Sequence, residues 1–244
     1  MNKKPLYEKI LNILKSGKEY KIIFIGDSLT SAEWVHPNWR DVFEYILKFS
    51  FEEFKDEDWW IPEWNLKFFN YSLDGASTRE FVKQVSISKQ EINPNLYIIM
   101  GTSNDIELNI PIDKHLQNIK EIFKIVEERD VVYSPDIYSN NENLNNRYEK
   151  YVEKVLSIET PFNITIVNGF KTFRRYHTPE FYTLDLDQDY QNIEQIQKDS
   201  VHPNTLGNVY ISKMFLEEIF GIEVNPEKYL QDIRLDTVKY PRWK

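Results

Sequence analysis

Short apolar runs alternate with longer amphipathic stretches along this chain. Five of the runs are almost continuously apolar and stop at polar or turn-forming residues; they cover 21–25, 66–71, 96–100, 131–133 and 164–167. Runs of this length without polar alternation are typical of parallel strands that are buried on both faces. The pattern therefore predicts five strands at these positions.

The stretches between the runs carry apolar residues at helical spacing. They predict helices over 5–15, 39–49, 111–126, 143–156 and 205–220. In the second of these helices the expected buried face consists of Val42, Tyr45, Ile46 and Phe49. The polar and aromatic segment 171–198 is long for a connection and is expected to hold a short helix of its own. Alternating strands and helices favour a three-layer α/β domain, in which ligands bind beyond the carboxyl ends of the strands.

The length of 244 residues fits one domain, 1–244, with a core over about 20–221 and with the N-terminal helix and C-terminal tail packed on it. The chain contains no cysteine, which excludes disulfides, a thiolate nucleophile and cysteine-ligated metals. It has only seven glycines, so there is no glycine-rich linker. A core of ordinary size is expected to form without covalent staples.

The charge and hydropathy patterns exclude two classes of partner. The net charge is 30 − 39 = −9 and no basic stripe stands out, which disfavours nucleic-acid binding. No apolar stretch approaches the roughly 18 residues of a membrane span, and the first residues lack the apolar run of a signal peptide. The sequence thus predicts a cytoplasmic protein, and it leaves a homo-oligomer open.

The chain contains four short polar motifs. Three of them stand at or after predicted strand ends, and the fourth stands just before the last long helix. They are Gly26-Asp27-Ser28-Leu29, Asn70 to Gly75, Asn104-Asp105, and Asp199-Ser200-Val201-His202. In a parallel sheet the strand ends share one edge, so these motifs are expected to meet there. A serine hydroxyl becomes a good nucleophile when an imidazole takes its proton, and the imidazole needs an acceptor on its other nitrogen.

The four motifs, in this order, resemble the conserved blocks of the GDSL, or SGNH, hydrolase family. The resemblance implies a flavodoxin-like α/β/α sandwich with five parallel strands, and ester hydrolysis without a metal or cofactor. It also implies that Ser28 is the nucleophile, His202 the general base and Asp199 the residue that orients His202. The backbone N–H groups of Ser28 and Gly75 and the side chain of Asn104 would form the oxyanion hole.

One block departs from the family pattern, which is usually Gly-x-Asn-Asp. Here Gly101 and Asn104 are separated by two residues, so either Gly101 is displaced by an insertion or Thr102 stands where the glycine usually does. Asp27 and Asp105 are expected to be structural. His115, on a predicted helix with charged neighbours, is expected to face solvent.

The aromatic residues near the predicted site leave several interpretations open. Trp34 and His36 follow Ser28 closely and are candidates for substrate contact, with packing or capping as the alternative. Trp59, Trp60 and Trp64 could stack on a sugar, contact another protein or simply pack. The sequence does not choose between these three.

The predicted function is that of a serine ester hydrolase that removes short acyl groups, most simply acetyl groups on a carbohydrate, through an acyl-enzyme. The preference for acetyl groups on carbohydrates is implied by the family resemblance. One alternative is a lysophospholipase or thioesterase for longer acyl chains. Another is a catalytically silent binding module on the same fold. A metal-dependent phosphoesterase built on Asp27, Asp199 and His202 is disfavoured, because no further ligands are evident.

Overall fold

The computed structural model describes residues 4–31, 34–52, 61–185 and 198–233. Five strands are present: β1 (Tyr20–Gly26), β2 (Leu66–Asn70), β3 (Leu96–Met100), β4 (Asp130–Ser134) and β5 (Ile164–Ile166). The α-helices are α1 (Pro5–Lys15), α2 (Trp39–Glu52), α3 (Thr78–Glu91), α4 (Asn104–Glu107), α5 (Ile112–Ile125), α6 (Glu142–Leu156), α7 (Gly169–Tyr176), α9 (Thr205–Phe215) and α10 (Pro226–Ile233). Three shorter turns of helix are η1 (Glu63–Asn65), η2 (Pro179–Phe181) and η3 (Leu216–Phe220).

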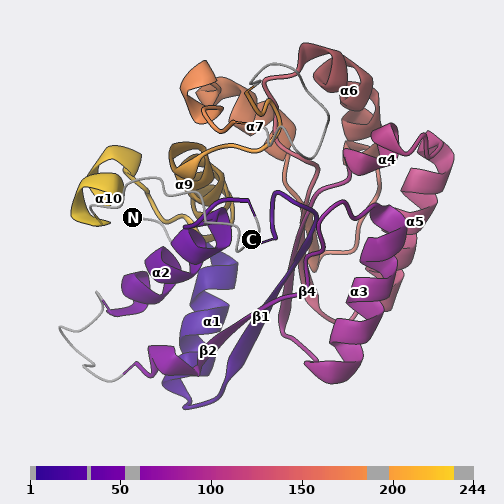
Figure 1. The fold of residues 1–244 in the computed structure, drawn as a ribbon. Helices are drawn as coiled ribbons and strands as arrows, with labels where there is room; N and C mark the ends of the chain where they lie inside the picture. The colour runs from indigo at the N-terminus through magenta and orange to yellow at the C-terminus, as the bar shows by residue number, and fades with distance from the viewer. Residues whose placement is uncertain (1–3, 32–33, 53–60, 186–197, 234–244) are drawn as a thin grey trace, which may run out of the picture.

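The strands form one sheet in the order β2-β1-β3-β4-β5, and every neighbouring pair is parallel. All five residues of β3, the central strand, are buried. This burial explains why its sequence, LYIIM, shows no polar alternation: both faces of the strand meet helices. The five predicted strands and the α/β/α class are confirmed (Figure 1).

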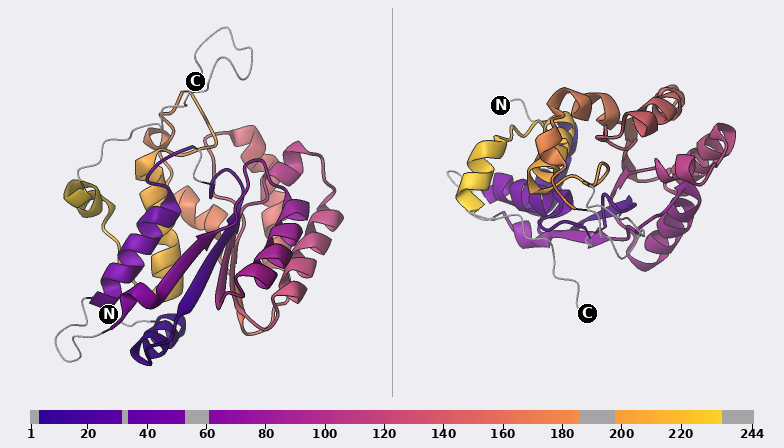
Figure 2. Two further views of the ribbon diagram at one scale, coloured as in Figure 1. Left: turned by 60° about the horizontal axis from the view of Figure 1, so that its bottom comes forward. Right: turned by 45° about the horizontal axis from the view of Figure 1, so that its top comes forward.

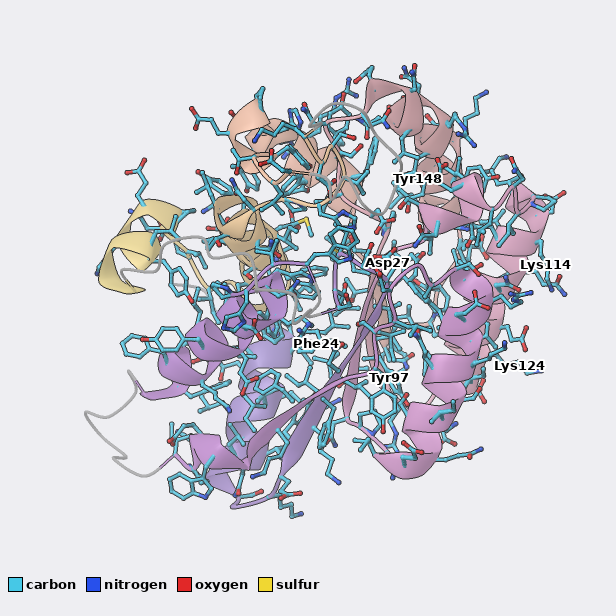
Figure 3. The ribbon with its side chains drawn as sticks, in the orientation of Figure 1. Phe24, Asp27, Tyr97, Lys114, Lys124 and Tyr148 are labelled. Atoms are coloured by element: carbon cyan, nitrogen blue, oxygen red, sulfur yellow. The ribbon has the colours of Figure 1, made fainter. Side chains whose placement is uncertain are left out.

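Helices cover both faces of the sheet (Figures 1 and 2). On one face α1, α2 and α9 pack on side chains such as Phe24, and on the other α3 and α5 pack on side chains such as Tyr97. Figure 3 shows Phe24 on the side of α2 and Tyr97 on the side of α3. The carboxyl ends of the strands, where Asp27 lies, are left for the loops that carry the polar motifs.

The buried face of α2 differs from the predicted one. Tyr45 and Phe49 are exposed, whereas Phe43 and Leu47 are fully buried beside Val42. The rings of Tyr45 and Phe49 stack on each other, with centroids 6.2 Å apart. The Tyr45 ring also contacts the ring of Tyr229 in α10 edge-on. Periodicity alone misplaced the face because α2 is apolar on most of its circumference.

The sequence did not predict α3, and it predicted a short helix in 171–198 without bounds. Helix α3 follows the second motif and begins with a capping box in which Ser77 and Glu80 satisfy each other's backbone N–H groups. Within the segment 171–198 the structure places most of α7 and all of η2, which confirms a short helix there. Residues 186–197 lie outside the described part of the chain.

Helix α9 is fixed against α2 by hydrogen bonds as well as by apolar packing. The Asn208 side chain accepts from the Trp39 N–H at 2.9 Å, and the Ser212 hydroxyl donates to the Trp39 carbonyl at 2.5 Å. The ring of Trp39 stacks on Phe215 with centroids 4.9 Å apart. Because α2 follows the first motif and α9 follows the last, this contact sets the distance between the two motifs.

The N-terminal helix packs on the same core. Tyr7, Ile10, Leu11 and Leu14 of α1 are buried in the cluster that holds α2 and α9. The single-domain organisation stays a prediction, and residues 234–244 of the tail lie outside the described residues. Within the described ranges, no helix is long and apolar enough to cross a membrane.

Candidate active site

Ser28, His202 and Asp199 are joined by hydrogen bonds at the carboxyl edge of the sheet. The Ser28 hydroxyl lies 2.8 Å from His202 Nε2, and His202 Nδ1 lies 2.7 Å from Asp199 Oδ2. If Nδ1 carries the proton that faces Asp199, Nε2 is left as an acceptor for the Ser28 hydroxyl. The three residues that the sequence singled out are therefore brought together in the order that proton transfer from serine requires.

The chain positions Ser28 by a tight turn at the end of β1. A Cβ atom added at Gly26 would lie 2.5 Å from Thr30 Cβ and 2.7 Å from the Met100 carbonyl oxygen, so only glycine fits there. After Gly26 the backbone turns, and the Thr30 and Ser31 N–H groups both bond the Asp27 carbonyl. The turn leaves Ser28 facing His202.

The loop before α9 holds Asp199 rigidly. Its N–H donates to the Leu184 carbonyl at 2.8 Å, and its Oδ1 accepts from the N–H groups of Val201 and His202 at 2.8 and 2.9 Å. Burial raises the pKa of Asp199, but hydrogen bonds from His202 and Val201 and the His202 charge outweigh burial, so its pKa lies below the ordinary value. Asp199 therefore stays ionised and oriented toward Nδ1.

Donors without protein partners lie on the loops next to Ser28. Within the described residues the backbone N–H groups of Ser28 and Gly75 donate to no protein acceptor. Gly75 has a φ of +68°, the left-handed region that favours glycine, and open space surrounds its Cα. The Asn104 side chain donates to the Ala76 carbonyl at 3.0 Å, which ties the third motif to the second and leaves one amide hydrogen unused.

The third motif contains two successive residues with positive φ, Gly101 at +145° and Thr102 at +119°. This φ is unfavourable for a β-branched residue and stores strain. Thr102 is fully buried, and its hydroxyl lies 2.7 Å from the Tyr148 hydroxyl, which holds it in place. The extra residue of the block is thus accommodated by two consecutive positive-φ positions, with Asn104 at the start of α4.

Two buried carboxylates lie under this motif. Asp27 accepts from the Leu29 N–H at 3.1 Å and the Thr102 N–H at 3.4 Å, and Asp136 accepts from the Ser103 N–H at 2.6 Å. Burial, together with the charge of Asp136, raises the pKa of Asp27 well above its ordinary value. Burial likewise raises the pKa of Asp136 to about 6. Both carboxylates accept hydrogen bonds from backbone N–H groups of the loops, which fits a structural role for Asp27.

His115 is buried, which corrects the expectation that it faces solvent. Its ring is completely inaccessible, and its Nδ1 lies 2.8 Å from Asp105 Oδ2. Asp105 also accepts from the N–H and the hydroxyl of Thr78, at 2.8 and 2.6 Å. A buried carboxylate needs such partners, and here they join α3, α4 and α5 behind Asn104.

Trp34 and His36 occupy different places near the site. The indole of Trp34 stacks on the His202 ring, with centroids 4.0 Å apart and planes inclined by 3°, and its Nε1 donates to Asp74 Oδ1 at 3.0 Å. His36 is more than half exposed and pairs with Asp41 of α2 at 3.1 Å. Of the tryptophan cluster, Trp64 is exposed in η1, and residues 59 and 60 lie outside the described part.

Two side chains near the site, and one contact of Trp34, were not anticipated from the sequence. Asp136 follows β4 in Ser134-Pro135-Asp136, and the strand-end rule that found the other motifs would have found it. Asp74 lies inside the second motif but carried no chemical signal of its own. The stacking of Trp34 on His202 joins residues far apart in the sequence, and nothing in the sequence pattern indicates it.

The metal-centred alternative required Asp27 to meet Asp199 and His202. Instead, the Asp27 carboxylate accepts from Leu29 and Thr102, and Asp199 and His202 bond to each other. Over the ranges that the structure describes, no group of three or more histidine, aspartate or glutamate side chains is arranged to hold a metal ion.

Three solved structures share this fold at low sequence identity. A catalytic mutant of Axe2, an acetylxylan esterase from Geobacillus stearothermophilus, matches with a TM-score of 0.63 and 17% identity over 83% of this chain and 94% of that chain. LAE5, an α/β hydrolase enzyme from the metagenome of Lake Arreo, Spain, matches with a TM-score of 0.60 and 17% identity over 83% of this chain and 95% of that chain. A lipase/acylhydrolase from Enterococcus faecalis matches with a TM-score of 0.57 and 18% identity over 82% of this chain and 95% of that chain.

The sequence itself identifies the family. A search of curated proteins found no match. Residues 24–209, however, match the profile of the GDSL-like lipase/acylhydrolase family, and this span runs from β1 through the first half of α9. It includes all four polar motifs. The chain therefore belongs to the GDSL-like lipase/acylhydrolase family and is a carboxylic ester hydrolase.

Proposed function

We propose that the protein hydrolyses short-chain carboxylic esters through an acyl-enzyme on Ser28, with O-acetyl groups on a carbohydrate as the substrate class. The observation that carries this proposal is the unbroken hydrogen-bond chain from Ser28 through His202 to Asp199. A serine hydroxyl without such a base is a poor nucleophile at neutral pH.

Acylation moves one proton twice. His202 Nε2 accepts the proton from the Ser28 hydroxyl as the oxygen forms a bond to the ester carbonyl carbon. The tetrahedral oxyanion accepts hydrogen bonds from the N–H groups of Ser28 and Gly75 and from the Asn104 amide. His202 then gives its proton to the alcohol oxygen as the carbon–oxygen bond breaks, which leaves the acyl group on Ser28.

Deacylation repeats these steps with water. A water molecule gives a proton to His202 as its oxygen attacks the acyl carbon, the same three donors stabilise the oxyanion, and the proton returns to Ser28 when the carboxylic acid leaves. Neutral donors suit this task, because Asn104 brings no charge that would compete for Asp199. Asp199 stabilises the imidazolium in both halves of the cycle.

A small recess near Ser28 is consistent with a short acyl group. A recess lined by Leu29, Ser103, Asp136, Tyr148 and Val201, among others, adjoins the chain neighbours of Ser28, Asn104 and His202. It has room for about one water molecule, so an alkyl chain does not fit inside it. The carbohydrate part of the proposal is supported by the family resemblance and by the fold shared with an acetylxylan esterase.

A preference for longer acyl chains is the second candidate, and one observation favours it. Leu73 and Leu108 are both more than half exposed, one just before Asp74 and Gly75 and the other just after α4. Exposed leucines on the two loops that carry Gly75 and Asn104 could contact an alkyl chain lying outside the recess.

The proposal is tested by initial rates on p-nitrophenyl acetate, butyrate and octanoate and on acetylated xylo-oligosaccharides. We expect the wild type to prefer acetate, and Ser28→Ala to lose activity on all of them. Ser86→Ala, on the far side of the sheet in α3, is the matched control and should keep full activity. A preference for octanoate would favour the second candidate, and activity retained by Ser28→Ala would overturn the acyl-enzyme.

A further inference from the structure

The ring of His202 is held on three sides. Asp199 bonds Nδ1 at 2.7 Å, Ser28 bonds Nε2 at 2.8 Å, and the indole of Trp34 covers one ring face at a centroid distance of 4.0 Å. Two in-plane hydrogen bonds still allow the imidazole to rock about the line that joins its two nitrogens. A flat ring lying parallel to the imidazole opposes that rocking.

The indole is itself anchored. Its Nε1 donates to Asp74 Oδ1 at 3.0 Å, and Asp74 directly precedes Gly75. Trp34 thus connects three parts of the site, since it lies on the loop after Ser28, stacks on the loop before α9 and bonds the second motif. A tryptophan that merely filled space would need neither a parallel ring contact nor a fixed indole N–H.

The stacking is also electrostatically selective. The π face of an indole attracts a cation within about 6 Å, and the attraction is worth about 0.5 to 2 kcal/mol, depending on solvent exposure. His202 is neutral before each attack and positively charged afterwards, so the indole stabilises the charged form more than the neutral one. A carboxylate that accepts from the indole N–H increases the electron density of the ring and strengthens this preference.

We propose that Trp34 is a positioning residue for ester hydrolysis: its indole, anchored by Asp74, holds the His202 ring in the plane that meets Ser28 and stabilises the imidazolium formed in each half-cycle. The proposal rests on the proposed function of His202 as the general base. It differs from substrate contact and from packing or capping, the alternatives that the sequence left open, because the indole acts through His202.

The groups that face His202 define what else could alter its protonation. Asp199 faces Nδ1, Ser28 faces Nε2, and Asp74 lies behind the indole. Tyr182 lies near Asp199. Burial raises the pKa of Tyr182, and the negative charge of Asp199 raises it further. Substitution of Trp34 leaves the first two contacts intact, so a change in pH profile reports on the indole.

The first test separates kcat from KM. We expect Trp34→Leu to lower kcat on p-nitrophenyl acetate by about 2- to 30-fold with KM within about twofold of the wild type. The acid limb of the kcat/KM profile should move to lower pH, because the imidazolium loses stabilisation. Trp34→Phe should restore part of kcat, and Asp74→Leu should lower it less than Trp34→Leu does. Trp64→Leu, at the amino end of β2, is the matched control and should leave both constants unchanged.

The second test needs no activity and so separates this proposal from the proposed function. A protonated imidazole stacked on an indole quenches its fluorescence, so in the Ser28→Ala variant the emission should fall as His202 becomes protonated. This fall should disappear in Ser28→Ala/Trp34→Phe and in Ser28→Ala/His202→Gln.

The outcomes divide cleanly between the two proposals. A raised KM with unchanged kcat for Trp34→Leu would make Trp34 a substrate contact and overturn the positioning proposal. Unchanged kinetics with unchanged pH profile, or quenching that survives both double variants, would also overturn it. Full activity of Ser28→Ala or His202→Gln would instead overturn the proposed function, whatever Trp34 does.

Discussion

The side-chain amide of Asn104 donates a hydrogen bond to the backbone carbonyl of Ala76 at 3.0 Å. This bond fixes one of the two amide hydrogens and so sets the direction of the other. It also joins the loop after β3 to the loop after β2, on which Gly75 lies one residue before Ala76. Two of the three proposed oxyanion donors therefore belong to one hydrogen-bonded unit.

Asn104→Ala removes a proposed oxyanion donor without adding charge. We expect kcat on p-nitrophenyl acetate to fall by about 100- to 1,000-fold, with a small change in KM, because the lost bond forms in the transition state. Asn104→Asp should be worse, since it places a negative charge beside the oxyanion. Asn12→Ala, on the exposed face of α1, should behave as the wild type. Equal rates for Asn104→Ala and Asn12→Ala would remove Asn104 from the mechanism.

Asp199→Asn keeps the shape of the side chain but removes its charge. The amide oxygen that this change introduces can still accept from the N–H groups of Val201 and His202, which turns the new NH2 group toward His202 Nδ1. His202 must then carry its proton on Nε2 and cannot accept from Ser28. We expect kcat to fall by about 10³- to 10⁴-fold, because the imidazole is then in the wrong tautomer. Thermal unfolding should show that the fold persists. A loss of less than tenfold would mean that Asp199 does not orient His202.

Gly101 and Gly17 both have positive φ, but they differ in the space around Cα. A Cβ at Gly101 would lie 2.7 Å from Phe81 Cζ and 2.8 Å from Asp27 Oδ2, whereas nothing lies within 4 Å at Gly17. We expect Gly101→Ala to cost about 2–5 kcal/mol of unfolding free energy, and Gly17→Ala about 1–2 kcal/mol. Urea unfolding of both variants measures the difference. Equal losses would show that the loop after β3 yields more easily than its packing indicates.

Asp136 gives a pH dependence with a defined sign. Its pKa is raised to about 6 by burial, so the unfolded chain ionises it at lower pH than the folded protein does. Between about pH 4 and pH 6 the folded state binds more protons, and stability conferred through this group falls as pH rises. Asp136→Asn removes the effect, so its free energy of unfolding relative to the wild type should increase from pH 4 to pH 7, by on the order of 1–3 kcal/mol.

Asp199 changes stability in the opposite direction and serves as the internal comparison. Its pKa is lowered, so the stability that it contributes is present above its ordinary pKa and is lost as pH falls through the folded value. This loss is common to the wild type and Asp136→Asn, and it cancels in their difference. Parallel stability curves for the two proteins would mean that Asp136 ionises normally in the folded state.

Much of the fold could be predicted because each strand is defined by its own residues. The run LYIIM at 96–100 is buried on both faces, so no polar residue interrupts it, and its predicted bounds coincide with β3. Three of the four motifs could be placed because parallel strands bring their carboxyl ends to one edge. Proximity of Ser28 and His202 followed from that rule together with the family resemblance.

What could not be predicted depends on contacts between distant segments. The face of α2 was misassigned because Tyr45 and Phe49 match the spacing of buried residues. Only the packing of Phe43 on Phe24 and Phe68 of the sheet and on Phe220 shows which face is covered. His115 looked solvated because its helix neighbours are charged, but it is buried beside Asp105 of α4. Trp34 stacks on the ring of His202, which is far away in the sequence, and no local pattern indicates this contact.

The pairing of α2 with α9 links the stability of the fold to the proposed chemistry. Ser28 and His202 lie 174 positions apart in the chain, and α9, which follows the His202 loop, is fixed against Trp39 of α2. Until α9 is docked, Ser28 therefore has no imidazole beside it. The proposed hydrolysis therefore requires that α9 dock on α2, so its activity would report directly on the Trp39 contacts.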